Sequence, residues 1–172
     1  MALRTLKDAL EDELKDILSS ERQITRALPK MAKKASNPLL KAGFEEHLAQ
    51  TKEHVARVEK AFGLLGKKPQ SKTCDATKGL LEEGASIMEE EADPDVMDAL
   101  LIGAAQKVEH YEIASYGSLK AWAELLGYGD AVNLLQQTLN EEKATDEKLT
   151  RIAESAVNME EKQAEHVQAG AE

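Results

Sequence analysis

Residues 10–31 read LEDELKDILSSERQITRALPKM, and their pattern decides the fold class. Apolar residues, interrupted once by a glutamate, recur along this stretch in alternating steps of four and three residues. They are Leu10, Leu14, Ile17, Glu21, Ile24, Leu28 and Met31. Such spacing is typical of the inward face of a helix in a bundle. The sequence therefore predicts a long amphipathic helix that carries one glutamate, Glu21, on its apolar face.

The same pattern returns near the end of the chain, again with a glutamate in it. Its positions are Ala131, Leu135, Thr138, Glu142, Thr145, Leu149, Ile152, Ala156 and Met159. An isolated buried charge is far more costly than a buried neutral group, so each carboxylate needs a partner. A lysine, an arginine or a water-filled space can provide that partner for a single glutamate. Two inward carboxylates on different helices favour a cation shared between them.

Composition narrows the class of protein. The chain has 172 residues, enough for one domain with a core, and aromatic residues are only 3% of it. Its formal net charge of −10, with basic residues scattered among acidic ones, argues against nucleic acid as a partner. The single cysteine, Cys74, favours a reducing compartment. Because there is no membrane-length apolar run and no typical secretory signal, we expect a cytoplasmic protein without a membrane partner.

Periodicity and turn signals predict four long helices and one short helix. The long helices cover residues 3–34, 38–66, 94–126 and 131–157, and the short one covers residues 76–91. Asn37 and Asp93, each followed by proline, and also Asp130, are the expected N-caps of the later long helices. Pro29 predicts a kink or a local break in the first helix.

Loop lengths predict the topology. Short turns join the first two and the last two long helices, whereas about 25 to 30 residues connect the pairs, which is long for a compact bundle. With such a crossover, the second and third long helices run parallel. The sequence thus predicts an all-α, ferritin-like four-helix bundle over residues 1–157, with a short extra helix in the crossover. We expect residues 158–172 to form a polar tail that is flexible or contacts another subunit.

Polar residues on the inward faces are the candidate metal ligands. They are Glu21 on the first long helix, Glu109 and Glu112 on the third, and Glu142 and Asp146 on the fourth. The second long helix has His47, Gln50 and His54 along one edge of its apolar face, and we expect Gln50 or His54 to be its ligand. Other glutamates are expected to point to water, among them Glu46, Glu53, Glu59 and Glu141.

Several carboxylates with one or two imidazoles, supplied by four facing helices, are the ligand set of a di-iron or di-manganese centre. Without cations, such acids would tend to protonate in an apolar interior. The sequence has no zinc-type Cys/His spacing, no glycine-rich phosphate loop and no nucleophile elbow. We therefore predict two iron ions, with manganese as the alternative, and Glu21 and Glu112 as bridging ligands.

Four stretches resemble the YciE/YciF-type ferritin-like proteins, a bacterial family related to the rubrerythrin fold. They are residues 14–23 (LKDILSSERQ), 106–117 (QKVEHYEIASYG), 126–128 (LGY) and 141–146 (EEKATD). The resemblance spans nearly all of the chain before the tail, and it implies a four-helix bundle, a homodimer, a di-metal centre and a link to bacterial stress. The chain departs from the usual ferritin-like pattern of Glu-x-x-His on the second and fourth helices. Its fourth long helix offers Glu142 and Asp146 without a histidine, and Gln50 stands where relatives carry glutamate.

Two functions follow as hypotheses. The first is a di-iron or di-manganese carboxylate protein that reduces dioxygen or peroxide during bacterial stress. The second is a stress-associated structural or interaction protein whose polar core holds water or a stray ion. Iron storage is less favoured, because a storage cage needs extensive self-assembly surfaces.

Overall fold

The computed structural model describes residues 3–154, and all regular structure within that range is helical. The helices are α1 (Leu6–Lys34), α2 (Pro38–Leu64), α3 (Asp75–Glu89), α4 (Pro94–Leu125) and α5 (Gly129–Ile152). These positions confirm the all-α prediction, including the short helix in the crossover. The predicted end of the last helix at residue 157 and the predicted tail at residues 158–172 lie outside the described residues.

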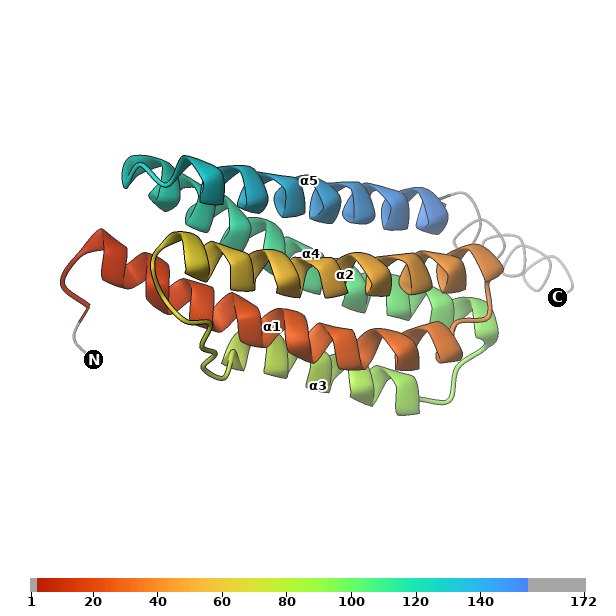
Figure 1. Cartoon of the computed structure of the whole chain (residues 1–172). Helices are drawn as coiled ribbons and strands as arrows, with labels where there is room; N and C mark the ends of the chain where they lie inside the picture. The colour runs from red at the N-terminus through yellow and green to blue at the C-terminus, as the bar shows by residue number, and fades with distance from the viewer. Residues whose placement is uncertain (1–2, 155–172) are drawn as a thin grey trace, which may run out of the picture.

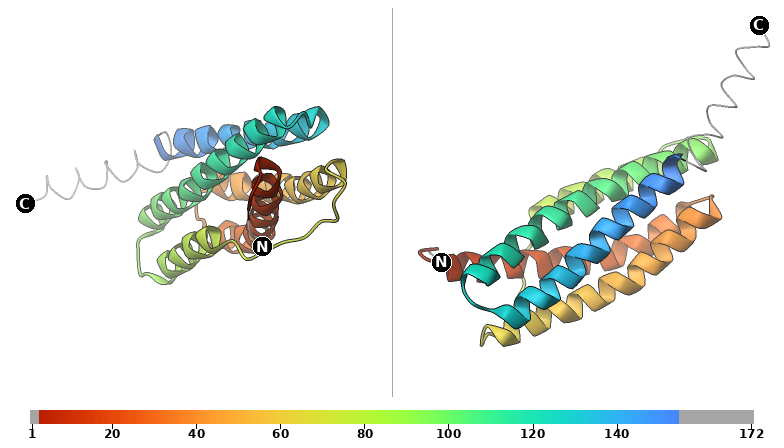
Figure 2. Two further views of the ribbon diagram at one scale, coloured as in Figure 1. Left: turned by 90° about the vertical axis from the view of Figure 1, so that its left-hand side faces the viewer. Right: turned by 90° about the horizontal axis from the view of Figure 1, so that it is seen from above.

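The four long helices form a bundle, and α3 packs on its outside (Figure 1). Both α1 and α5 pack against α2 and α4, so each long helix has two long neighbours. The views in Figure 2 show α3 beside α1 and α4, the two helices that it contacts. The chain direction in Figure 1 shows α2 and α4 running parallel to each other and antiparallel to α1 and α5. The long crossover therefore has the predicted effect on topology.

Capping side chains explain where the first two helices begin. Thr5 and Asp8 form a capping box at α1, in which the Thr5 hydroxyl accepts the Asp8 N–H at 3.1 Å and the Asp8 carboxylate accepts the Thr5 N–H at 2.9 Å. Asn37 caps α2 as predicted, because its side-chain oxygen accepts the backbone N–H groups of Leu39 and Leu40.

The N-cap prediction for Asp130 was wrong, and the predictions for Pro29 and Asp93 were wrong in part. Pro29 causes no local break, since α1 runs through it without interruption, and the alternative, a kink, stays a prediction. This proline lies on the exposed side, while Leu28 and Met31 hold the same turn against the core. Asp93 occupies the predicted N-cap position of α4 and is followed by Pro94, but its side chain makes no capping hydrogen bond. Asp130 does not cap α5, because the helix already begins at Gly129. Its carboxylate lies in the first turn of the helix, where a negative charge interacts favourably with the helix dipole.

The core consists of two apolar clusters separated by a polar layer. One cluster includes Leu14 and Phe62, and the other includes Leu28 and Phe44. Asp98 of α4 is a buried acid within the second cluster, where it accepts the backbone N–H groups of Ser36 and Asn37. On every long helix, other buried acids or histidines fall between the residues of one cluster and those of the other. They are Glu21 on α1, His47 and His54 on α2, Glu109 and Glu112 on α4, and Glu142 on α5. Among the described residues, no helix has the length and apolarity needed to cross a membrane.

Candidate metal centre

Two groups of ligand-type side chains meet in the polar layer. The first group consists of Glu21, His54 and Glu142, and the second consists of His47, Glu109, Glu112 and Glu142. Within each group, one nitrogen or oxygen atom per residue lies within 4.8 Å of the corresponding atom of every other member. We call the first group the Glu21 site and the second the Glu109 site. Glu142 belongs to both.

The Glu21 site is completely enclosed, since its three side chains are 0% exposed. His54 Nδ1 lies 2.8 Å from Glu142 Oε1 and 3.6 Å from Glu21 Oε1. The Tyr116 hydroxyl donates a hydrogen bond to the Glu21 carboxylate. Burial, together with the charge of the Glu21 carboxylate, raises the pKa of Tyr116 well above its usual value, so the phenol remains a donor.

Glu141 and Arg57 support the Glu21 site from the surface side of α2 and α5. His54 Nε2 lies 2.8 Å from Glu141 Oε2. Arg57 donates two hydrogen bonds to the same carboxylate, from Nη1 at 2.6 Å and from Nη2 at 3.0 Å. Burial opposes the charge of Glu141, but the hydrogen bonds from Arg57 and His54 outweigh it and lower its pKa. A carboxylate can only accept, so it orients His54 with Nε2–H outward and Nδ1 toward the centre.

The prediction that Glu141 points to water was therefore wrong. Its side chain is 25% exposed and is bound by two residues of α2, His54 and Arg57. Helical periodicity puts this position outside the apolar face, but the packing of α5 against α2 brings it over the imidazole edge.

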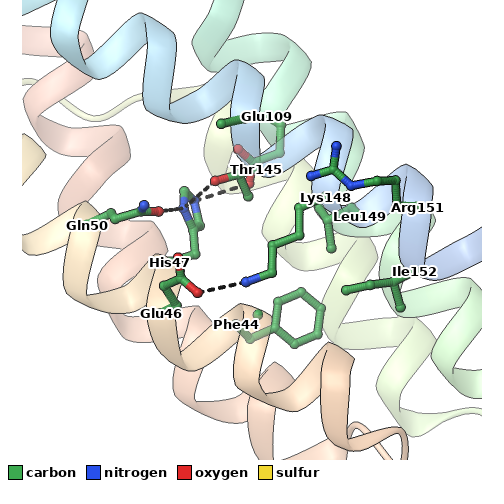
Figure 3. A pocket seen from close by; sticks show the side chains of 12 residues that line it. Phe44, Glu46, His47, Gln50, Glu109, Thr145, Lys148, Leu149, Arg151 and Ile152 are labelled. Carbon is green, nitrogen blue, oxygen red and sulfur yellow. Dashed lines mark hydrogen bonds and ion pairs between the residues drawn. The ribbon is translucent and has the colours of Figure 1, made fainter.

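The Glu109 site is built around the second histidine. His47 Nε2 lies 3.2 Å from Glu109 Oε1 and 3.7 Å from Glu142 Oε2. On the opposite edge of the ring, Nδ1 lies 3.3 Å from both Gln50 Oε1 and Thr145 Oγ1 (Figure 3). His47 thus stands between the carboxylates of the centre and two neutral side chains nearer the surface.

Within the described part of the chain, every buried side-chain nitrogen or oxygen that lacks a hydrogen-bond partner belongs to this centre. These atoms are Glu21 Oε2, His47 Nε2, His54 Nδ1, Glu109 Oε2, both carboxylate oxygens of Glu112 and both of Glu142. Although His54 Nδ1 and Glu142 Oε1 are only 2.8 Å apart, they are not aligned as a hydrogen bond. Leaving one such atom unpaired costs about 1–3 kcal/mol, and native proteins contain few. Converging carboxylate and imidazole atoms without mutual hydrogen bonds fit a divalent cation such as iron or manganese.

Burial controls the charge of these acids in the protein alone. It raises the pKa of Glu109 and of Glu142 to about 7. It also raises the pKa of Glu112 well above its usual value and that of Glu21 in the same direction, with neighbouring carboxylates adding to both shifts. Burial disfavours the charged form of His54, but the carboxylates of Glu142 and Glu21 outweigh it and raise its pKa to about 10. Protons thus offset charge that a bound cation would otherwise offset.

The structure brings together five of the seven residues that the sequence predicts as ligands, namely Glu21, His54, Glu109, Glu112 and Glu142. Asp146 lies outside both groups. The Gln50 amide oxygen lies 3.3 Å from His47 Nδ1, on the edge of the ring that faces away from the carboxylates. The Asp146 carboxylate accepts a hydrogen bond from Gln106 Nε2 at 3.0 Å and lies 3.3 Å from His110 Nε2. That each of the seven binds metal stays a prediction.

His47 is the residue of the centre that the sequence-based choice of ligands missed. It is only 3% exposed. A signal was present, because His47 and His54 are seven residues apart and therefore lie two turns apart on one face of α2. The choice of Gln50 over His47 followed the expected ferritin-like pattern rather than this periodicity.

Comparison with known proteins places the chain in a family. The family model described as "Domain of unknown function (DUF892)" matches residues 5–162. The chain belongs to the DUF892 family. Protein YciF of Escherichia coli (strain K12) is 45% identical over 159 residues, which cover 92% of this chain and 96% of YciF. The resemblance to YciF-type proteins is thereby confirmed.

Solved structures confirm the ferritin-like fold of this DUF892 chain. The E. coli stress protein YciF matches with a TM-score of 0.88 and 45% identity, covering 91% of this chain and 99% of YciF. YcfI from Rhodopseudomonas palustris, provisionally described as a structural protein, matches with a TM-score of 0.84 and 46% identity over 86% and 94% of the two chains. A ferritin-like, diiron-carboxylate protein from Bacillus anthracis str. Ames matches with a TM-score of 0.67 and 18% identity over 87% and 99%. At that identity, the last likeness concerns the fold alone.

Proposed function

We propose that this protein binds two iron ions, or two manganese ions, in the polar layer of its bundle. One observation carries the proposal: the unpartnered buried atoms converge in two ligand groups that share a residue. An apolar core would not retain such atoms without a compensating partner, because each is costly to desolvate. Two divalent cations would compensate all of them at once.

The geometry supports an assignment of ligands to the two ions. One ion would be held by the Glu21 site and the other by the Glu109 site. Glu142 is suited to bridge them, because its Oε1 faces His54 Nδ1 while its Oε2 faces His47 Nε2. We therefore prefer Glu142 as the bridging ligand to Glu21 and Glu112, each of which belongs to one group only.

For the reaction, we propose reduction of dioxygen or peroxide during stress, as a cytoplasmic homodimer. Bound iron would supply the one-electron redox chemistry. The chain itself would hold the carboxylates in place, orient His54 through Glu141, and exclude bulk water with the apolar clusters on both sides of the layer. The description of the relative YciF as a stress protein supports the setting.

Anaerobic loading with Fe(II), followed by exposure to peroxide, tests this proposal. The full chain should bind two equivalents of iron and oxidise them faster than free Fe(II) is oxidised. Glu21→Ala should retain about one equivalent, since it removes a ligand from one group only. Glu53→Ala, an exposed position on α2, is the matched control and should behave as the wild type. Failure of the wild type to bind iron would contradict the proposal.

One observation favours the second candidate function, a stress-associated structural protein with a non-catalytic core. The raised pKa values of Glu109 and Glu142 allow these acids to stay neutral by holding protons. Wild-type protein that binds two iron ions but does not accelerate their oxidation would support this candidate over the redox function.

A further inference from the structure

A pocket of about 190 Å³ opens between α2 and α5 and reaches the Glu109 site (Figure 3). His47 and Glu109 line its buried end, and each is 3% exposed. Small residues, Gly43 on α2 and Ala144 on α5, help to keep the space open. A single water needs about 30 Å³ in the liquid, so the pocket has room for a cation with part of its hydration shell.

Oxygen and nitrogen atoms line the pocket from the surface to the centre. Glu46 stands at the mouth with its side chain 61% exposed. Deeper in, Gln50 Oε1 and Thr145 Oγ1 lie 3.3 Å from His47 Nδ1. The carboxylate of Glu109 follows, 3.2 Å from the other ring nitrogen of the histidine. Such oxygen and imidazole groups can replace the waters of a divalent cation one after another.

An ion pair crosses the mouth of the pocket. Lys148 Nζ on α5 lies 2.7 Å from Glu46 Oε2 on α2. Because the two side chains are 38% and 61% exposed, the pair is weak and opens readily. Arg151 also lines the mouth and lies 3.9 Å from Glu147. The charges of Lys148 and Glu46 oppose each other, as do those of Arg151 and Glu147, so the mouth carries no large excess of positive charge that would repel a cation.

A second pocket touches the centre but does not suit an ion. It has a volume of only about 10 Å³, which is room for a single water molecule at most and not for a hydrated cation. Apart from Glu109, its lining is apolar, with Ile24, Leu28 and Val108 among the residues. An ion entering there would lose its hydration before it met a ligand.

We propose that the pocket between α2 and α5 is the route by which divalent cations reach the centre, with the Lys148–Glu46 ion pair as its gate. This inference rests on the proposed function. An incoming cation takes the place of Lys148 at the Glu46 carboxylate, passes Gln50 and Thr145, and arrives at Glu109. The Glu109 site therefore fills before the enclosed Glu21 site.

The rate of cobalt(II) uptake by the full metal-free chain, followed by stopped-flow absorbance, tests the route. Ala144→Phe adds a ring at an exposed wall of the pocket and should slow uptake by about tenfold or more, with the final stoichiometry unchanged. Lys148→Met removes the gate and should speed uptake. Asn133→Phe, at an exposed position of α5 outside the pocket lining, is the matched control and should keep the wild-type rate.

A second variant that narrows the pocket keeps the test valid if Ala144→Phe fails to fold. At Gly43 an added Cβ would lie 3.8 Å from Ile152 Cδ1 and 3.9 Å from Lys148 Cε, which are ordinary contacts. Gly43→Leu therefore fits at its first carbon and should extend into the pocket from the α2 side, slowing uptake as well. Wild-type rates in both Ala144→Phe and Gly43→Leu, with two cobalt ions bound, would overturn the route and leave the metal centre intact. Wild-type protein that binds no cobalt would instead defeat the proposed function.

Discussion

The Glu21 site and the Glu109 site share Glu142 but hold their histidines in different ways. In the Glu21 site, the outer nitrogen of His54 meets the charged Glu141 carboxylate at 2.8 Å, and Arg57 fixes that carboxylate with two hydrogen bonds. In the Glu109 site, the outer nitrogen of His47 meets only neutral groups, at 3.3 Å. Hydrogen bonds to charged groups are shorter and about twice as strong as neutral ones.

The two sites also differ in how far solvent and ions can reach them. The Glu21 site is 0% exposed and carries an additional hydrogen bond from Tyr116 to Glu21. The Glu109 site lies at the end of a pocket of about 190 Å³. We infer that the Glu21 site is the rigid half of the centre, which retains its ion, and that the Glu109 site is the adaptable half, which exchanges its ion.

Replacing the shared ligand should have the largest effect, because it damages both halves. In Glu142→Ala we expect the loss of both ions and a drop in metal affinity of about 100-fold or more. This drop exceeds the loss that follows when a residue that only supports a ligand is replaced. Isothermal titration with manganese(II) measures both stoichiometry and affinity. Glu147→Ala, exposed on the same helix, is the control and should bind normally. Two ions bound with wild-type affinity in Glu142→Ala would show that this residue is not the shared ligand.

Removing the support of His54 should weaken only the rigid half. In Glu141→Ala we expect the affinity of the Glu21 site to fall by about 10- to 100-fold, as for other carboxylates that orient a metal-binding histidine. The Glu109 site should keep its affinity, because His47 does not contact Glu141. Titration with two resolved binding steps separates these outcomes. Equal weakening of both steps would contradict the independence of the two halves.

The pH dependence of the metal-free protein should reveal how protons replace cations. In the folded state the pKa of Glu109 and of Glu142 is raised from 4.5 to about 7, so their stabilising contribution is complete below pH 4.5 and is lost as the pH rises through 7. The raised pKa of His54 acts in the same direction, between 6.5 and about 10. The free energy of unfolding should therefore fall between pH 5 and pH 9.

Urea denaturation at several pH values in the presence of a chelator measures this fall. Glu112→Gln removes one buried acid with a raised pKa and should make the pH dependence shallower. A stability that increases with pH in the wild type would contradict the account. Manganese should oppose the loss at high pH, since cations bind the deprotonated carboxylates.

The smallest effect on metal affinity is expected when a neutral side chain that contacts His47, in the adaptable half, is removed. Gln50→Ala removes one of the two 3.3 Å contacts of His47 Nδ1 and leaves Thr145 in place. A neutral hydrogen bond contributes about 0.5–1.5 kcal/mol, so the affinity of the Glu109 site should fall about 2- to 13-fold. The same titration as for Glu141→Ala applies. A loss as large as in that variant would remove the contrast between the two halves.

Much of the centre could be predicted because helical periodicity places a residue on a face without knowledge of its neighbours. Glu21, Glu112 and Glu142 interrupt apolar faces, and all three are buried where the pattern puts them. The polar layer also follows from this pattern, since each interruption falls near the middle of its helix.

Contacts between helices determine the features of the centre that the sequence did not predict, and helical periodicity does not describe those contacts. Asp146 lies one turn beyond Glu142 on α5, yet Gln106 and His110 of α4 bind it away from the centre. Glu141 lies beside the apolar face, yet α2 presents both His54 and Arg57 to it. Both outcomes depend on which side chains of the neighbouring helix face α5, and a single sequence does not reveal this.

A crystal structure of the full chain loaded with Fe(II), with anomalous data collected at the iron edge, tests the two-site centre most directly. We predict two anomalous peaks that share the Glu142 carboxylate, one beside His54 Nδ1 and the other beside His47 Nε2. A loaded crystal without a peak in the polar layer, or with iron bound only at the protein surface, would contradict the account.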